Sequence, residues 1–153
     1  MNKKTDLFEL LPCAIESILY DADYMVSLEI EKDLYAVKLN AYEGTIVTFV
    51  DTNCSNNSHI NIIHQILLKF KESAGFTLER VIIEAKYGDV FYCRLHWKHQ
   101  NGDIYNVTSL GDALILAMLS DAPIFIVRFV VNQLEKAERE AYIEIYEDED
   151  DDY

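Results

Sequence analysis

Residues 80–107 read RVIIEAKYGDVFYCRLHWKHQNGDIYNV, and two turn signals divide them into three apolar runs. Gly88-Asp89 suits a two-residue type II′ hairpin turn, because glycine takes the first turn position at positive φ. Asn101-Gly102 is a strong signal for a type I′ turn. We therefore predict a meander of three antiparallel strands that begins near Arg80 and ends near Val107.

A second hairpin is predicted nearer the N-terminus. Apolar and polar residues alternate from Tyr24 to Ile30, as they do in a half-buried strand. Glu31-Lys32-Asp33 forms a polar turn, and a second alternating run from Tyr35 to Leu39 is the partner strand. The following stretch, Glu43 to Asp51, is rich in β-branched residues and favours a strand by propensity alone.

A helix is predicted after each hairpin-rich region. Apolar residues recur at helical spacing from Ile60 to Phe70, and Gly75 suits the C-terminal cap of that helix. Ser109 and Asp112 have the spacing of a capping box, which opens a nearly all-apolar helix that runs through Leu119.

The C-terminal part of the sequence predicts one more strand and one more helix. Pro123 ends the apolar helix, and Ile124 to Val127 is a short core strand. Asn132 to about Ile145 is expected to be helical, and the acidic end to be solvated and disordered. Together these elements predict an α+β fold, with a curved, mixed, mainly antiparallel sheet built from two hairpin-rich halves and packed with helices.

The chain is strongly acidic. It has 153 residues, with 13 Lys and Arg against 27 Asp and Glu, and a formal net charge of −14. Seven of the acids lie within the last ten residues, so residues 1–143 still carry −7. Nonspecific nucleic-acid binding depends on the neutralisation of phosphates by Lys and Arg, so this charge counts against tight binding of that kind.

Targeting and redox signals predict a soluble, cytoplasmic protein with no membrane span. Cys13, Cys54 and Cys93 are widely spaced and form no CxxC pair, so neither a zinc ribbon nor a disulfide framework is indicated. Asp6 and Glu9 interrupt the apolar run near the N-terminus, which excludes it as a signal peptide. No stretch approaches the roughly 20 apolar residues that a membrane span needs.

Four short sequence motifs occur in this order along the chain: residues 74–83 (AGFTLERVII), 88–95 (GDVFYCRL), 111–113 (GDA) and 122–125 (APIF). Together they resemble the bifunctional nuclease domain family, and weaker similarity extends the resemblance to about residues 24–130. The resemblance implies that residues 43–51 are a helix, because tertiary context often overrides propensity. We expect residues 1–135 to form a bifunctional-nuclease-like domain and residues 136–153 to form a helical extension with an acidic tail.

The resemblance also implies metal-assisted hydrolysis of phosphodiester bonds in DNA or RNA. Glu43, His64 and Asp112 fall on family positions. They are the implied catalytic residues, with the carboxylates holding a divalent metal such as Mg²⁺ or Mn²⁺ and His64 acting as base. Each also has a structural explanation. An acid in a first helical turn complements the helix dipole, and a histidine on an apolar helix is commonly buried and hydrogen-bonded.

The implied site departs from the family pattern. Val107, Ser109 and Gly111 stand where the family has Asp, Arg and Ser, and Gln65 stands where it has Asp. We therefore expect a degenerate site.

A second hypothesis is a noncatalytic, self-associating interaction module that keeps the fold. Large apolar residues on both faces of the meander leave room for a homo-oligomer interface. These residues are Val81, Ile83 and Tyr92 on one face and Ile82, Phe91 and Leu95 on the other.

Two histidine arrangements in the meander have simpler explanations than a binding site. Tyr92, Arg94 and His96 share one strand face that offers an anion-contact strip, but a solvated or cross-strand-paired face is preferred. His96 and His99 are three residues apart, which places them on opposite sides of a strand and argues against a metal pair.

Overall fold

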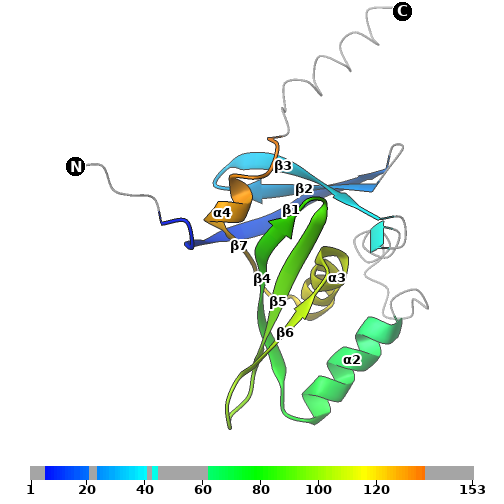
Figure 1. Cartoon of the computed structure of the whole chain (residues 1–153). Coiled ribbons are helices and arrows are strands. Elements are labelled where there is room, and N and C mark those ends of the chain that lie inside the picture. The colour runs from blue at the N-terminus through cyan, green and yellow to red at the C-terminus, as the bar shows by residue number, and fades with distance from the viewer. Residues whose placement is uncertain (1–5, 21–23, 41–42, 45–61, 137–153) are drawn as a thin grey trace, which may run out of the picture.

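The computed structural model describes residues 6–20, 24–40, 43–44 and 62–136, and in them the strands form one seven-stranded sheet (Figure 1). The strands are β1 (Leu10–Tyr20), β2 (Tyr24–Ile30), β3 (Asp33–Leu39), β4 (Thr77–Tyr87), β5 (Val90–Lys98), β6 (Ile104–Thr108) and β7 (Ile124–Val127). The helices are α2 (Ile62–Ser73), α3 (Leu110–Ser120) and α4 (Arg128–Val131).

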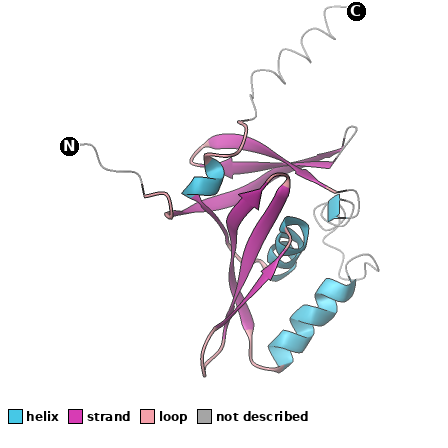
Figure 2. Ribbon diagram, in the orientation of Figure 1, coloured by secondary structure: helices cyan, strands magenta, loops and turns pink. Residues whose placement is uncertain are grey.

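The strand order is β3-β2-β1-β7-β4-β5-β6. β4 and β7 pair in parallel, whereas every other neighbouring pair is antiparallel. α3 packs against β4 and β5, and α2 packs against α3 at the outside of the molecule (Figure 2). This arrangement confirms the predicted α+β class and the mixed, mainly antiparallel sheet.

Strand β1 joins the two halves of the sheet. Its first part, Leu10–Cys13, pairs with β7, and its second part, from Ala14 onward, pairs with β2. No strand is predicted here from the sequence for two reasons. Pro12 cannot donate to a ladder, and a register shift at Glu16 interrupts the alternation of apolar and polar residues.

Two of the three predicted hairpin turns are confirmed. Glu31 and Lys32 form a two-residue turn between β2 and β3, and their φ angles of 51° and 72° are those that a type I′ turn requires. Gly88 opens the turn between β4 and β5 with a φ of 60°, and Tyr87 pairs with Val90 across it.

The predicted type I′ turn at Asn101-Gly102 is wrong. β5 and β6 first pair at Trp97 and Ile104, so residues 99–103 form a longer connection. The Asp103 carboxylate holds this connection open, because it accepts from the His99 backbone N–H (3.1 Å) and from His96 Nε2 (2.8 Å). The hydrogen bond from His96 is the main reason that the pKa of Asp103 lies below its usual value.

The helix ends follow the predicted capping signals. α2 ends in a Schellman motif, in which Gly75 has a φ of 86° and the Phe76 N–H donates to the Lys71 carbonyl (2.9 Å). Ser109 is the N-cap of α3, as predicted. Among the described helices, none is both long and apolar enough to cross a bilayer.

Two helix predictions need correction or lie outside the described residues. The predicted C-terminal helix does not start at Asn132; instead α4 ends at Val131, and residues 132–136 are turn and bridge. The part of that prediction beyond residue 136 lies outside the described residues. For the predicted helix at residues 43–51, Glu43 and Gly44 are helical and the rest is likewise outside them.

The core lies between the sheet and α3. Fully buried side chains from β4, β5, β7 and α3 meet there: Val81, Ile83, Cys93, Trp97, Leu114, Ile115 and Ile126. Three apolar residues of α2 lie outside this core, because Ile63, Ile66 and Phe70 are 70%, 58% and 72% exposed. α2 therefore fully buries only His64 among its residues.

Replacing Ile126 with alanine tests the role of the core around β7. The side chain is fully buried, so the Ile126→Ala variant should lose about 2–5 kcal/mol of unfolding free energy through lost burial and a cavity. The matched control is Ile66→Ala on the exposed face of α2, which should change stability by about 0.5 kcal/mol or less. Urea denaturation measures both, and equal losses would contradict this assignment of the core.

Candidate functional site

The structure brings Glu43, His64 and Asp112 together at the N-terminus of α3. His64 comes from α2, Asp112 from the first turn of α3, and Glu43 from the short helical segment after β3. His64 Nε2 lies 2.8 Å from Asp112 Oδ1. Glu43 and Asp112, which are 69 positions apart in the sequence, therefore meet at one end of α3.

The Ser109 hydroxyl stands at the centre of this cluster. Its oxygen lies 3.1 Å from Glu43 Oε2 and 3.2 Å from Asp112 Oδ2, and it accepts from the Asp112 backbone N–H (3.4 Å). A serine hydroxyl has one proton, so it can donate to only one of the two carboxylates at a time. The other carboxylate oxygen then faces a lone pair of the hydroxyl oxygen, and a cation would stabilise two carboxylates that share one hydroxyl.

Asn40 positions Glu43 by capping the helical segment that starts there. The Glu43 N–H donates to Asn40 Oδ1 (2.7 Å), and the Gly44 N–H donates to the Asn40 carbonyl (2.8 Å). The Asn40 side-chain amide in turn donates to Glu43 Oε1. This reciprocal pair resembles a capping box, and the Asn-x-x-Glu spacing is the sequence signal that could have identified Asn40.

Gly111 makes room for Glu43 beside α3. The glycine is buried, and a Cβ atom at this position would overlap both the carboxylate and the Cβ of Glu43. The sequence comparison marks Gly111 only as the loss of a family serine. In the structure Gly111 also has a packing role, because Glu43 can lie beside α3 only if position 111 has no side chain.

The hydrogen bond to Asp112 fixes the tautomer of His64. A carboxylate only accepts, so Nε2 carries a proton, and in the neutral imidazole Nδ1 is then the nitrogen with a free lone pair. His64 is 7% exposed, and its Nδ1 atom is buried without a hydrogen-bond partner within the described part of the chain. A carboxylate that orients one imidazole nitrogen and leaves the other as acceptor is the arrangement of a general base.

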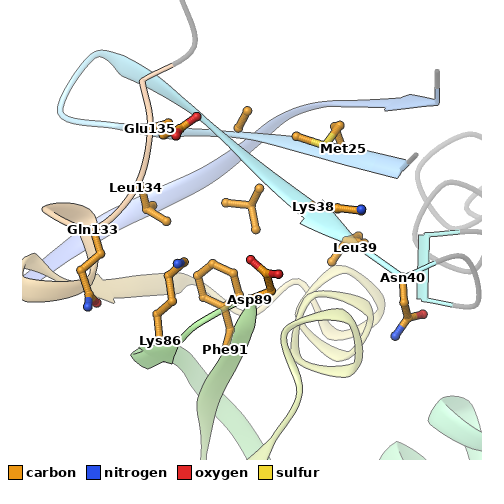
Figure 3. A pocket seen from close by; sticks show the side chains of 12 residues that line it. Met25, Lys38, Leu39, Asn40, Lys86, Asp89, Phe91, Gln133, Leu134 and Glu135 are labelled. Atoms are coloured by element: carbon orange, nitrogen blue, oxygen red, sulfur yellow. The ribbon is translucent and has the colours of Figure 1, made fainter. Parts of the chain in front are cut away.

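A cavity of about 390 Å³ adjoins the cluster, and His64 and Asp112 both line it. Its other walls come from α2, α3, β5 and the edge strand β6. A larger cavity of about 500 Å³ lies between β3, the β4–β5 hairpin and residues 133–135 (Figure 3). Figure 3 shows Asn40, the residue that holds Glu43, at one end of this second cavity.

The predicted anion-contact strip is a cross-strand-paired face, as the simpler explanation held. Arg94 donates twice to the Glu84 carboxylate (2.9 and 2.7 Å), which neutralises its charge. His96 lies between Asp103 and Arg80 and stacks on Tyr105 with ring centroids 4.5 Å apart. The His96–Asp103 pair therefore belongs to the β5–β6 connection.

Other chemistry in the described residues is limited. They contain no group of three or more His, Cys, Asp or Glu side chains placed to hold a metal ion. Cys13 and Cys93 are buried, and burial raises the pKa of each thiol to about 12. Neither is a nucleophile near neutral pH, because the thiolate is the reactive form.

Comparison with known families identifies the family of this chain. Residues 27–139 match the sequence model of the bifunctional nuclease domain, and this range contains Glu43, His64 and Asp112. No curated protein matches the chain.

A double replacement tests the packing of Glu43 on Gly111. Gly111→Ala should lower the free energy of unfolding by roughly 1–3 kcal/mol, because the added methyl overlaps Glu43. In a Glu43→Gly background the same change should stabilise by up to about 1 kcal/mol, because alanine is the better helix former. Glycine is needed at position 43 because the Cβ of Glu43 also fills the space. Urea denaturation of the four proteins measures the effect, and the same change in both backgrounds would refute the contact.

Proposed function

Because this chain belongs to the bifunctional nuclease domain family, we propose that Glu43, His64 and Asp112 hydrolyse phosphodiester bonds in DNA or RNA. The observation that carries the proposal is the His64–Asp112 hydrogen bond of 2.8 Å, which leaves Nδ1 of a cavity-lining imidazole as the acceptor. Water attacks phosphorus, its proton passes to His64 Nδ1, and the P–O bond to the leaving oxygen breaks. Asp112 holds the ring and stabilises the imidazolium that forms.

Glu43 and Asp112 are the groups that would hold a divalent cation. Mg²⁺ is commonly bound through one or two carboxylates together with waters and substrate phosphates, so a complete protein cage is not required. The shared Ser109 hydroxyl supports this role, because one proton cannot serve both carboxylates. A bound Mg²⁺ or Mn²⁺ would stabilise the negative charge of the transition state.

The residues that differ from the family pattern are expected to lower the rate of this activity. Ser109 stands where the family has an arginine, so a cationic contact to phosphate is missing at the helix end. An arginine clamp stabilises transition-state charge in phosphoryl transfer. We therefore expect slow, metal-dependent cleavage.

Cleavage assays with matched variants test the catalytic assignment. The purified protein is incubated with single- and double-stranded DNA and RNA, with Mg²⁺, with Mn²⁺ and with EDTA. Removal of the base in His64→Ala should lower the rate about 10²–10⁴-fold. Asp112→Asn and Glu43→Gln should also lose activity. The control is Asp103→Asn, which alters the second His–Asp pair and should leave the rate unchanged. Full activity in His64→Ala, or cleavage unaffected by EDTA, would refute the mechanism.

A second candidate function is the noncatalytic, self-associating module. The structure corrects the surface first considered for it, because Val81, Ile83, Ile82, Phe91 and Leu95 are all buried. The observation that favours it now is the exposed face of α2, with Ile63, Ile66 and Phe70. Exposed apolar patches of this kind mark interaction sites.

Light scattering at high micromolar concentration tests self-association. The unmodified protein should form a dimer or larger oligomer, and Phe70→Glu should shift it to a monomer because the charge cannot be buried in an apolar interface. Tyr87→Glu is the control, since Tyr87 is equally exposed but lies at the β4–β5 hairpin. A monomer at every concentration would remove this function.

A further inference from the structure

The cavity beside the cluster has apolar walls and a few polar groups. Leu67, Leu95 and Leu116 lie on its apolar side, and His64, Asp112 and Trp97 are also in the lining. Its volume of about 390 Å³ falls in the range of small-ligand sites. One end of the cavity therefore adjoins the residues proposed for hydrolysis. The rest of the cavity suits an apolar group that has polar atoms at its edge.

Trp97 contributes an unused hydrogen-bond donor to this region. The side chain is 1% exposed, and its indole Nε1–H is buried with no acceptor among the described residues. An indole nitrogen only donates, and a buried donor without an acceptor is costly. His64 Nδ1 is the second buried, unpartnered nitrogen on the lining. A bound group with an acceptor atom at its edge would satisfy the Trp97 donor, while His64 Nδ1 is left for the water of the proposed hydrolysis.

Lys71 places a positive charge at the same cavity. Its Nζ lies 5.1 Å from the centre of the Trp97 ring and 5.2 Å from that of Phe76. Among the described residues no carboxylate forms an ion pair with it, so its charge is available to a phosphate. Asn106 on the edge strand β6 adds an amide that can donate and accept at the cavity mouth.

We propose that this cavity binds one unstacked nucleobase of a single-stranded nucleic acid, and that Lys71 contacts the phosphate attached to it. The inference rests on the proposed function, since it assigns a substrate subsite to the same centre. A base has a flat face that fits the apolar walls. Its edge carries acceptor atoms, either carbonyl oxygens or ring nitrogens, that can accept from the Trp97 indole N–H. Bases in a duplex are paired and stacked, so only an unpaired base can enter.

Binding of nucleoside monophosphates tests the cavity without any cleavage. Trp97 is the only tryptophan in the sequence, so its fluorescence reports directly on the site. With EDTA present, uridine or adenosine 5′-monophosphate should quench Trp97 saturably, whereas ribose 5-phosphate, which lacks the base, should not. Equal quenching by ribose 5-phosphate would overturn the proposal.

Two variants locate the binding site. Leu67→Asp changes the apolar wall and should weaken binding at least tenfold. The control is Tyr87→Asp, which adds the same charge to an exposed residue of β4 outside the lining and should stay within about threefold of the unmodified protein. Trp97→Phe keeps the apolar bulk but removes the donor, and calorimetry should show about tenfold weaker binding. Equal affinities in Leu67→Asp and Tyr87→Asp would refute the site.

The outcome separates this inference from the proposed hydrolysis. Base-dependent binding without metal-dependent cleavage would support the cavity and refute the nuclease. Cleavage without base-dependent binding would support the nuclease and refute the cavity.

Discussion

The N-terminal turn of α3 is the constraint on which the site depends. Ser109 caps this turn, and its hydroxyl also contacts Glu43 and Asp112, which in turn contacts His64. A helix N-terminus leaves N–H groups without intrahelical partners and carries a partial positive charge, so it stabilises two adjacent carboxylates. The same interactions that cap the helix therefore assemble the residues assigned to chemistry. The position of Asp112 in the first turn of α3 is observed, and the catalytic role proposed for it would use the same carboxylate.

Local sequence signals predicted the elements whose structure is set locally. The β2–β3 and β4–β5 hairpins, the Gly75 cap and the Ser109 cap all depend on residues close in sequence, and all are confirmed. β1 was missed because its pairing partners are distant and its alternation is interrupted. The Asn101-Gly102 turn failed because a side chain, Asp103, offers the backbone an alternative hydrogen-bond acceptor.

The site was predictable only through the family resemblance. Periodicity alone places His64 on a helix and Asp112 at a cap, but it cannot bring Glu43 to them across a sheet. Gly111 shows the limit most clearly. In the sequence it is a missing polar group, whereas in the structure it is the space that Glu43 occupies. Glu43 and Gly111 are far apart in the chain, so no local sequence pattern can predict that they pack together.

The charge of the protein limits how the proposed nucleic-acid substrate could be held at this site. Some of the cations are engaged in ion pairs: Arg94 pairs with Glu84, Arg128 with Glu9 and Glu31, and Lys136 with Asp33. Phosphate neutralisation, the usual source of affinity, is therefore weak on a body of net charge −7. In the proposed function, affinity would come from a cation bound between the carboxylates and from burial of a base beside Trp97. Base burial does not depend on counterion release, so an acidic domain can bind a single strand where it would repel a duplex.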